Sequence, residues 1–391
     1  MIKKYAFLIL FSLFFNSLQS QVQLSVYSEI SIVTTGPGTE LYEAFGHSAI
    51  RVKDPMLQLD LIYNYGMFDF NQPNFYSNFV KGKLLYTLGR YPFSTFLQSY
   101  YQDKRWVKQQ VLNLTQQEKQ AFFNYLENNA LPQNSDYLYD PYFDNCATKL
   151  RDITSSVLKN KLHFGEENLP KNQTFRQLMN QEIPWNSWGS FGINVALGSK
   201  LDKKASVEGF MYLPKYIYSI FKNSKITNQG NSENLVKNEE ILLDFKNLAP
   251  KTSLFSPFLI FLIFSIIGIY ITFSDIKNQK RAKWLDVTIF SFTGIVGILI
   301  VFLWFFTNHS TTPNNFNFLW AFAPNFLIAF FLFKEKPPKW IAKYVKLLIV
   351  FLSLIPILWL LKIQEFPMAV IPLLLLFAVR FWFLTHKNLY K

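Results

Sequence analysis

The sequence predicts an α+β exported domain followed by an all-α bundle of about five membrane-spanning helices. Half of the 391 residues are hydrophobic and 18% are aromatic, which is too apolar on average for a single soluble globule. Residues 22–225 alternate short β-rich runs with helical patterns, whereas long apolar stretches recur from residue 253 onward. This composition excludes a disordered chain, and the single cysteine excludes a disulfide scaffold.

The formal charge of +13 raises the question of a nucleic-acid-binding surface. Residues 22–250 carry 23 Lys and Arg residues against 22 Asp and Glu residues, so this part of the chain is nearly neutral. Residues 251–391 carry 14 against 4. The basic excess belongs to the membrane-like end, and no nucleic-acid partner is expected.

Residues 1–20 have the pattern of a secretory signal peptide. Lys3 and Lys4 precede an apolar run over 5–15, and small or polar residues follow at 17–20. We expect cleavage after Ser20, with an uncleaved membrane anchor as the alternative. The chain then divides into an exported domain over 21–225, a solvated linker over 226–252 and a transmembrane domain over 253–391.

Five strands and three helices are predicted in the exported domain. The strands are the β-rich runs 24–33, 46–52, 57–65, 83–90 and 106–114, which Gly, Pro, Asn and Asp residues separate. Thr115 and Glu118 form a capping box before a helix that runs to Ala130. Asp144 is the expected cap of a second helix over 146–158, and Thr174 that of a third over 175–181.

Five apolar stretches approach the length of about 20 residues that crosses a hydrocarbon core. They are 253–273, 284–306, 318–333, 345–361 and 366–384. Lys and Arg residues concentrate in the loops after the first and third stretches, and the loops after the second and fourth contain only Lys362. By the positive-inside rule, the first pair of loops is cytoplasmic. The N-terminal domain and the loop 307–317 therefore face the exported side of an inner membrane.

Cys146 is the most informative residue for chemistry. An unpaired thiol is an oxidation liability in an exported protein, and Cys146 follows Asn145 at the predicted start of a helix. The partial positive charge of a helix N-terminus favours the thiolate, and the N–H groups of Cys146 and Ala147 would stabilise an oxyanion. The alternative is that Cys146 is a small buried apolar residue.

A nucleophilic cysteine needs a general base, and the chain has four histidines. His47 is the expected base, because it lies on a predicted strand among small residues that would let a substrate approach. The next strand offers Asn64 or a tyrosine hydroxyl such as that of Tyr65 to orient the imidazole. The alternative is that His47 is an ordinary surface residue or a core residue with satisfied hydrogen bonds.

Other catalytic patterns have no support in the sequence. There is no HExxH motif, no paired Cys or His spacing for a metal, no phosphate-binding loop and no GxSxG elbow. No metal and no cofactor is therefore expected.

The order of a histidine on an early strand and a cysteine that opens a helix resembles circularly permuted papain-like proteins of the NlpC/P60 and lecithin–retinol acyltransferase group. More specifically, the chain resembles the Bacteroidota family whose exported part is the Lnb N-terminal periplasmic domain. The matching residues are Ala44-Phe45-Gly46-His47-Ser48, Tyr63-Asn64-Tyr65-Gly66, Asn145-Cys146, Thr174-Phe175-Arg176, Leu197-Gly198 with Asp202, and Asn308-His309-Ser310. The resemblance covers nearly the entire chain.

This resemblance implies a membrane-bound acyltransferase. A fatty acyl group would pass from a phospholipid to Cys146, with His47 as the base, and then to the N-terminal amine of a diacylated lipoprotein. His309, in the loop on the exported side, would bind a head group or complete the site, with an ordinary polar loop as the alternative. Two other functions stay open: a membrane-anchored cysteine amidase or peptidase that acts on cell-wall peptides, and a non-enzymatic membrane scaffold.

Overall fold

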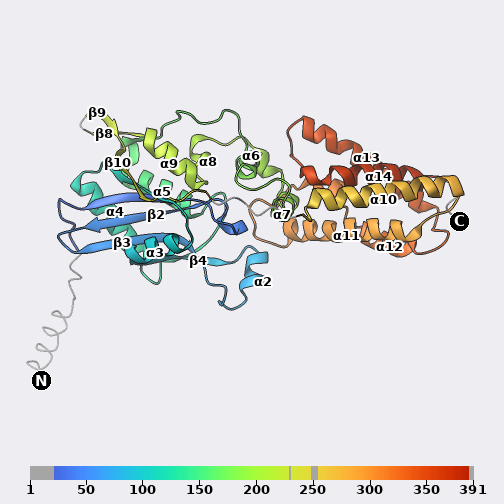
Figure 1. Cartoon of the computed structure of the whole chain (residues 1–391), viewed down its shortest axis with the longest axis horizontal. Coiled ribbons are helices and arrows are strands. Elements are labelled where there is room, and N and C mark those ends of the chain that lie inside the picture. The colour runs from blue at the N-terminus through green and yellow to red at the C-terminus, as the bar shows by residue number, and fades with distance from the viewer. Residues whose placement is uncertain (1–21, 229, 248–253, 387–391) are drawn as a thin grey trace, which may run out of the picture.

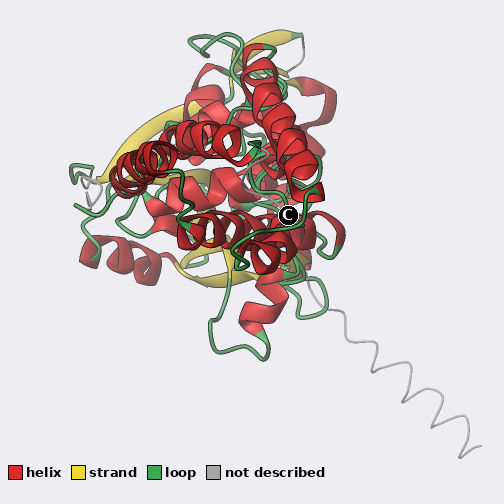
Figure 2. Cartoon of the chain, turned by 90° about the vertical axis from the view of Figure 1, so that its right-hand side faces the viewer, coloured by secondary structure: helices red, strands yellow, loops and turns green. Residues whose placement is uncertain are grey.

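The computed structural model describes residues 22–228, 230–247 and 254–386, so the predicted signal peptide lies outside the described residues. Figure 1 shows a sheet domain at one end and a bundle of helices at the other. In Figure 2 the helical end faces the viewer, and the bundle lies in front of the strands. The predicted fold class, an α+β domain followed by a helical membrane part, is confirmed.

An antiparallel seven-stranded sheet in the order β10-β5-β1-β2-β3-β4-β6 organises the N-terminal domain. The five predicted strands all form, with ends displaced by a few residues. The strands are β1 (Glu29–Thr35), β2 (His47–Asp54), β3 (Leu59–Met67), β4 (Leu85–Pro92), β5 (Val107–Leu112), β6 (Asp136–Leu138) and β10 (Val236–Leu243). A small second sheet joins β7 (Leu162–His163), β8 (Lys225–Asn228) and β9 (Asn231–Asn234).

The predicted linker over 226–252 is wrong for residues 226–243, because these residues complete β8 and form β9 and β10. Strand β10 pairs with β5 and forms one edge of the large sheet. An edge strand is half exposed, so it can carry charged residues. One of them, Glu239, also accepts from Gln110 Nε2 of β5 at 3.0 Å. The domain therefore extends to residue 243.

Helices cover both faces of the large sheet. One face packs against α4 (Gln116–Asn129), α5 (Cys146–Leu158) and α9 (Pro214–Asn223), and the other packs against α3 (Phe93–Gln102). Because side chains alternate along a strand, Ile50 of β2 contributes to the first core and Ala49 to the second. The remaining helical segments are η1 (Leu41–Glu43), α2 (Phe75–Val80), η2 (Lys159–Lys161), α6 (Phe175–Asn180), α7 (Trp188–Ala196), η3 (Ser199–Asp202) and α8 (Val207–Phe210).

Three helices of the C-terminal part are long and apolar enough to cross a membrane: α10 (Pro257–Asn278), α11 (Lys283–Phe305) and α13 (Trp340–Leu360). The other predicted spans are composite. The third consists of η4 (Phe316–Leu319) and α12 (Asn325–Leu332), and the fifth consists of η5 (Met368–Val370) and α14 (Ile371–Leu384). The third span is broken because Pro324 begins a new helix there.

The basic loops and the sheet domain lie at opposite ends of the bundle. Lys283 contacts Glu335, and Arg281 donates to the carbonyl of Lys334, so the two basic loops contact each other. At the other end, Gln177 Nε2 donates to Glu365 in the loop between α13 and α14 at 2.5 Å. This arrangement agrees with the orientation that the loop charges predict.

Candidate functional site

His47 opens β2 at the end of the sheet that is nearer to the helical bundle. Strand β2 begins directly after Gly46, whose φ of +73° belongs to the left-handed region that glycine adopts most easily. A side chain at position 46 would also lie 2.7 Å from the Thr35 carbonyl oxygen. Gly46 therefore allows the chain to turn sharply into β2, which places the His47 imidazole at the start of the strand.

Asn64 of β3 holds the imidazole in place. The β2–β3 register pairs Ile50 with Tyr63, which brings the end of β3 next to the start of β2. The Asn64 side-chain oxygen lies 2.5 Å from His47 Nε2, and its Nδ2 donates to the Tyr91 hydroxyl at 2.8 Å. Since Asn64 oxygen can only accept, Nε2 carries a proton, and Nδ1 is left for another partner.

Cys146 approaches the imidazole from the first turn of α5. The expected cap Asp144 is wrong: Asn145 is the N-cap, and its Oδ1 accepts from Ala147 N and Thr148 N at 2.9 Å each. The Asn145 amide also donates to the carbonyls of Pro141 and Tyr212, at 2.7 and 2.9 Å. Asn145 thereby fixes where the helix begins and where the cysteine points.

The side chains of Cys146 and His47 lie close enough for each to shift the pKa of the other, through its charge and as a hydrogen-bonding partner. Burial by itself would raise the pKa of Cys146, but the charge and the hydrogen bond of His47, with the N–H groups of Ser48 and Ala147, lower it below the ordinary thiol value. Burial would likewise lower the pKa of His47, yet the charge of Cys146 and hydrogen bonds to Cys146 and Asn64 raise it. These opposite shifts favour transfer of the thiol proton from Cys146 to His47.

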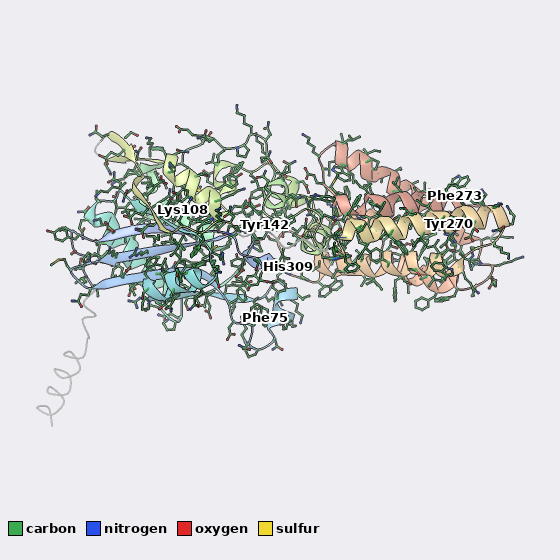
Figure 3. All side chains as sticks on the ribbon, viewed as in Figure 1. Phe75, Lys108, Tyr142, Tyr270, Phe273 and His309 are labelled. Atoms are coloured by element: carbon green, nitrogen blue, oxygen red, sulfur yellow. The ribbon has the colours of Figure 1, made fainter. Side chains whose placement is uncertain are left out.

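The other predicted site residues lie elsewhere. Tyr65 is a core residue whose hydroxyl accepts from Asn129 Nδ2 at 2.8 Å, so Asn64, rather than Tyr65, is the group on the imidazole. His309 does not reach the pair either: its Nε2 donates to the carbonyl of Val80 at 3.1 Å. Figure 3 shows His309 at the junction between the sheet domain and the bundle.

The loop that carries His309 nevertheless contacts the cysteine loop. The Ser310 hydroxyl donates to Asp140, and the Asp140 and Asp144 backbones bond to each other at 3.1 Å just before Cys146. Lys200 Nζ donates to the Ser310 carbonyl at 3.1 Å. The exported-side loop between α11 and η4 is therefore connected to the cysteine through one short stretch of chain.

Tyr137 is a site residue that sequence reasoning missed. Its buried hydroxyl has no hydrogen-bond partner among the described residues. A Cβ atom placed on Gly66 would lie 3.6 Å from Cys146 Cβ and 3.9 Å from this hydroxyl, so both groups border the same small space. Burial and the charge of Cys146 raise the pKa of Tyr137, which keeps it protonated as a donor. Its place on the short strand β6 gave no signal in the sequence.

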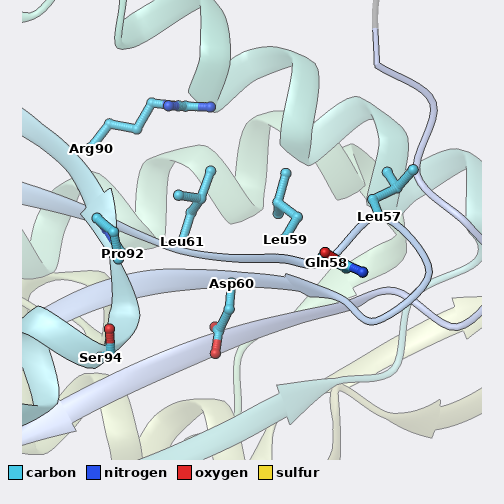
Figure 4. A pocket seen from close by; sticks show the side chains of 8 residues that line it. All are labelled: Leu57, Gln58, Leu59, Asp60, Leu61, Arg90, Pro92 and Ser94. Carbon is cyan, nitrogen blue, oxygen red and sulfur yellow. The ribbon is translucent and has the colours of Figure 1, made fainter.

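The hollow in Figure 4 is separate from this pair. It has a volume of about 490 Å³ and is lined by residues from the start of β3 and the end of β4 and just beyond them, including Leu59, Asp60 and Arg90. The pair lies toward the other end of β3, where Cys146 is next to Gly66 and His47 contacts Asn64. Within the described parts of the chain, no group of three or more His, Cys, Asp and Glu side chains could hold a metal ion.

Taken together, the fold and the site define a membrane protein whose α+β domain carries a buried cysteine beside a half-buried histidine, next to its membrane-spanning helices. Residues 15–181 match the family model described as the Lnb N-terminal periplasmic domain, and residues 249–391 match the one described as the Lnb transmembrane domain. The chain belongs to the Lnb family, and its N-terminal domain is a periplasmic domain. No curated protein and no solved structure matches it.

Proposed function

We propose that this protein is a thiol acyltransferase of the inner membrane. It would move a fatty acyl group from a phospholipid to Cys146 and then to the N-terminal amine of a diacylated lipoprotein. The observation that carries the proposal is the interacting Cys146–His47 pair in a domain whose cysteine loop is bonded to a loop between membrane helices. Family membership agrees with a role at the membrane.

The first half of the reaction forms the acyl-enzyme. His47 takes the proton from the Cys146 sulfur, and the thiolate attacks the carbonyl carbon of the lipid ester. A C–S bond forms, the ester C–O bond breaks, and His47 returns the proton to the departing lysophospholipid oxygen. In the second half, the acceptor amine attacks the thioester and gives its proton to His47 as the C–S bond breaks.

The oxyanion in both halves needs hydrogen-bond donors. Of the two N–H groups that the sequence suggested, that of Ala147 already donates to Asn145 Oδ1. The Tyr137 hydroxyl takes this role in our proposal, because it is buried without a partner beside Gly66 and Cys146. Removal of one such donor costs about 10²–10³ in turnover in comparable sites.

The position of the site favours a lipid substrate over a soluble peptide. An ester within a bilayer has a negligible concentration in water, so an enzyme that attacks it must be held at the interface. The contacts of Ser310 with Asp140 and of Lys200 with the Ser310 carbonyl hold the cysteine loop against the membrane part. A peptidase of the cell wall would have no need of this contact.

The test is intact mass spectrometry of the full-length protein after incubation in phosphatidylethanolamine–phosphatidylglycerol vesicles. We expect an acyl-sized mass increase in the wild type and none in Cys146→Ala. Addition of a diacylated lipopeptide with a free N-terminal amine should discharge the adduct and raise the lipopeptide mass by the same amount. An adduct that persists in Cys146→Ala, or no adduct in the wild type, would overturn the proposal.

A further inference from the structure

A short aromatic segment between β3 and β4 is exposed on the side of the periplasmic domain next to the bundle. We call its exposed residues Phe70, Tyr76, Phe79 and Val80 the α2 patch; Tyr76 is 73% exposed and Phe79 is 53% exposed. Beneath it, the ring of buried Phe75 lies 5.0 Å from that of Phe70 and 5.2 Å from that of Tyr76. Exposed apolar surface of this kind marks a binding surface.

The end of a membrane-spanning helix fixes the height of the patch. Helix α11 has 23 residues, so it is about 34 Å long and spans a hydrocarbon core of about 30 Å. Its outer end is Phe305, and three residues later the Asn308 N–H donates to the Lys81 carbonyl at 2.9 Å. His309 bonds to the Val80 carbonyl. The C-terminal end of α2 is thus fixed at the outer boundary of the membrane.

Close packing makes this attachment rigid. Gly82, with a φ of +66°, lies so close to the loop that a Cβ atom there would be 2.8 Å from His309 N. In Figure 3, Phe75 and His309 lie near each other beside the bundle. His309 therefore has a structural role in this attachment.

The charge around the patch suits a lipid surface. One exposed acidic residue, Asp69, precedes Phe70 and none follows between residues 70 and 85, whereas Lys81 and Lys83 are exposed at the end of α2. Exposed aromatic residues flanked by lysines are typical of segments that lie in the interface of a membrane. Phe305 at the end of α11 and Phe306 directly after it are also exposed, so the apolar surface of this membrane-spanning helix extends to the loop that bonds to α2.

We propose that the α2 patch lies in the outer leaflet of the membrane that α11 crosses, and that lipid chains are its partner. This inference does not depend on the acyl-transfer chemistry. A run of aromatic rings also leads from this segment toward the site. The Phe68 ring lies 5.2 Å from that of Tyr86, and Tyr86 stacks at 4.2 Å on Tyr139, which borders Gly66 and Cys146.

Fluorescent labelling of single cysteines in the full chain tests the inference. In the Cys146→Ala background, Tyr76→Cys and, separately, Phe79→Cys would carry a bimane label in phosphatidylethanolamine–phosphatidylglycerol vesicles that contain lipids brominated in their acyl chains. The matched control is Met56→Cys, which is 67% exposed at the β2–β3 turn, the far end of β2 from His47. Because Cys146 is absent, the result is independent of whether the proposed function is right.

We expect the brominated lipids to quench most of the fluorescence at positions 76 and 79 and little at position 56, with aqueous iodide showing the reverse. Equal quenching by brominated lipids at positions 76, 79 and 56 would overturn the proposal. Shielding of positions 76 and 79 from both quenchers would also overturn it, because another protein surface, such as a second copy of the chain, would then cover the patch.

Discussion

At the scale of single residues, the cysteine–histidine pair depends on a third group that carries no charge. Asn64 accepts from His47 Nε2 and is itself held by the Tyr91 hydroxyl. Burial lowers the pKa of His47. The interactions with Cys146 and, after them, the hydrogen bond with Asn64 raise it. A charged imidazole in turn lowers the pKa of Cys146. Asn64 therefore acts on the thiol through the histidine.

We predict that Asn64→Ala moves the pH dependence of Cys146 alkylation to higher pH. A neutral alkylating reagent reacts with the thiolate, so its rate rises as the pH passes through the pKa of Cys146. Without Asn64 the imidazolium is less stable, the thiolate loses part of its partner, and the midpoint rises by about one pH unit, the equivalent of a hydrogen bond of about 1.4 kcal/mol.

Iodoacetamide labelling of the full-length protein between pH 5 and 9 measures this midpoint. Tyr91→Phe is the matched control, because it removes only the partner of the Asn64 amide and leaves the bond to His47. Its midpoint should move by a smaller amount in the same direction. An Asn64→Ala profile that coincides with the wild type would show that Asn64 does not act on the pair.

The sequence predicts part of the candidate site at this scale. His47 and Cys146 are predicted because the chain has few histidines and one cysteine, and Asn64 or a tyrosine such as Tyr65 because adjacent strands bring neighbouring positions together. In the structure Asn64 contacts His47, whereas Tyr65 bonds to Asn129. The role of Tyr137 could not be predicted, since it depends on a small space beside Gly66 that only the folded chain creates. Likewise, the contact of His309 with Val80 joins residues 229 positions apart.

At the scale of elements, helix α5 places the cysteine because its first turn is capped from within. Asn145 accepts from two N–H groups of that turn and donates to two carbonyls outside it, and Thr148 Oγ1 accepts from Asn145 N at 2.7 Å. The predicted bounds of this helix, 146–158, are confirmed. The cap was predicted one residue too early because Asp and Asn are both good caps, and their order in Asp144-Asn145 does not discriminate between them.

We predict that Asn145→Ala lowers the thermal stability more than a comparable cap deletion elsewhere. Loss of the cap costs about 1–2 kcal/mol, and the carbonyls of Pro141 and Tyr212 also lose a buried donor. Thr115→Ala is the matched control, since Thr115 caps α4 in the same way but is exposed. Thermal unfolding of the full-length protein in detergent compares them, and equal decreases in Tm would contradict this account of Asn145.

Strand β10 shows why element prediction failed at the end of the domain. Val236–Leu243 is rich in charged residues and lacks the alternation of a half-buried strand. It forms a strand because β5 offers an unpaired edge and because Gln109 and Gln110 provide side-chain donors to Glu240 and Glu239. Neither cause is visible within the segment itself.

At the scale of the whole molecule, buried polar groups join the periplasmic domain to the bundle. Arg176 is fully buried and bonds to Asp202 at 2.9 Å and to the carbonyls of Leu197 and Gly198 at 3.0 and 2.9 Å. It thereby shapes the turn onto which the loop after α11 docks. Loop charges predicted which side of the membrane the domain occupies, but this docking depends on backbone atoms and could not be read from residue types.

Gly198 belongs to the turn onto which this loop docks. Its N–H donates to the Thr311 carbonyl at 2.9 Å, and a Cβ atom at this position would lie 1.9 Å from the carbonyl oxygen of Pro313, so Gly198→Ala must push the loop away from the turn. If the contact holds the site at the lipid, acyl-adduct formation in vesicles should fall by about 10- to 100-fold, as for other displacements of about 1 Å, while iodoacetamide still labels Cys146 at the wild-type rate. Gly192→Ala is the matched control, because nothing lies within 4 Å of the added atom and alanine favours helix α7 by about 0.5–1 kcal/mol. Equal adduct yields from the two variants would mean that the domain reaches its lipid without this contact, and that the membrane helices serve only as an anchor.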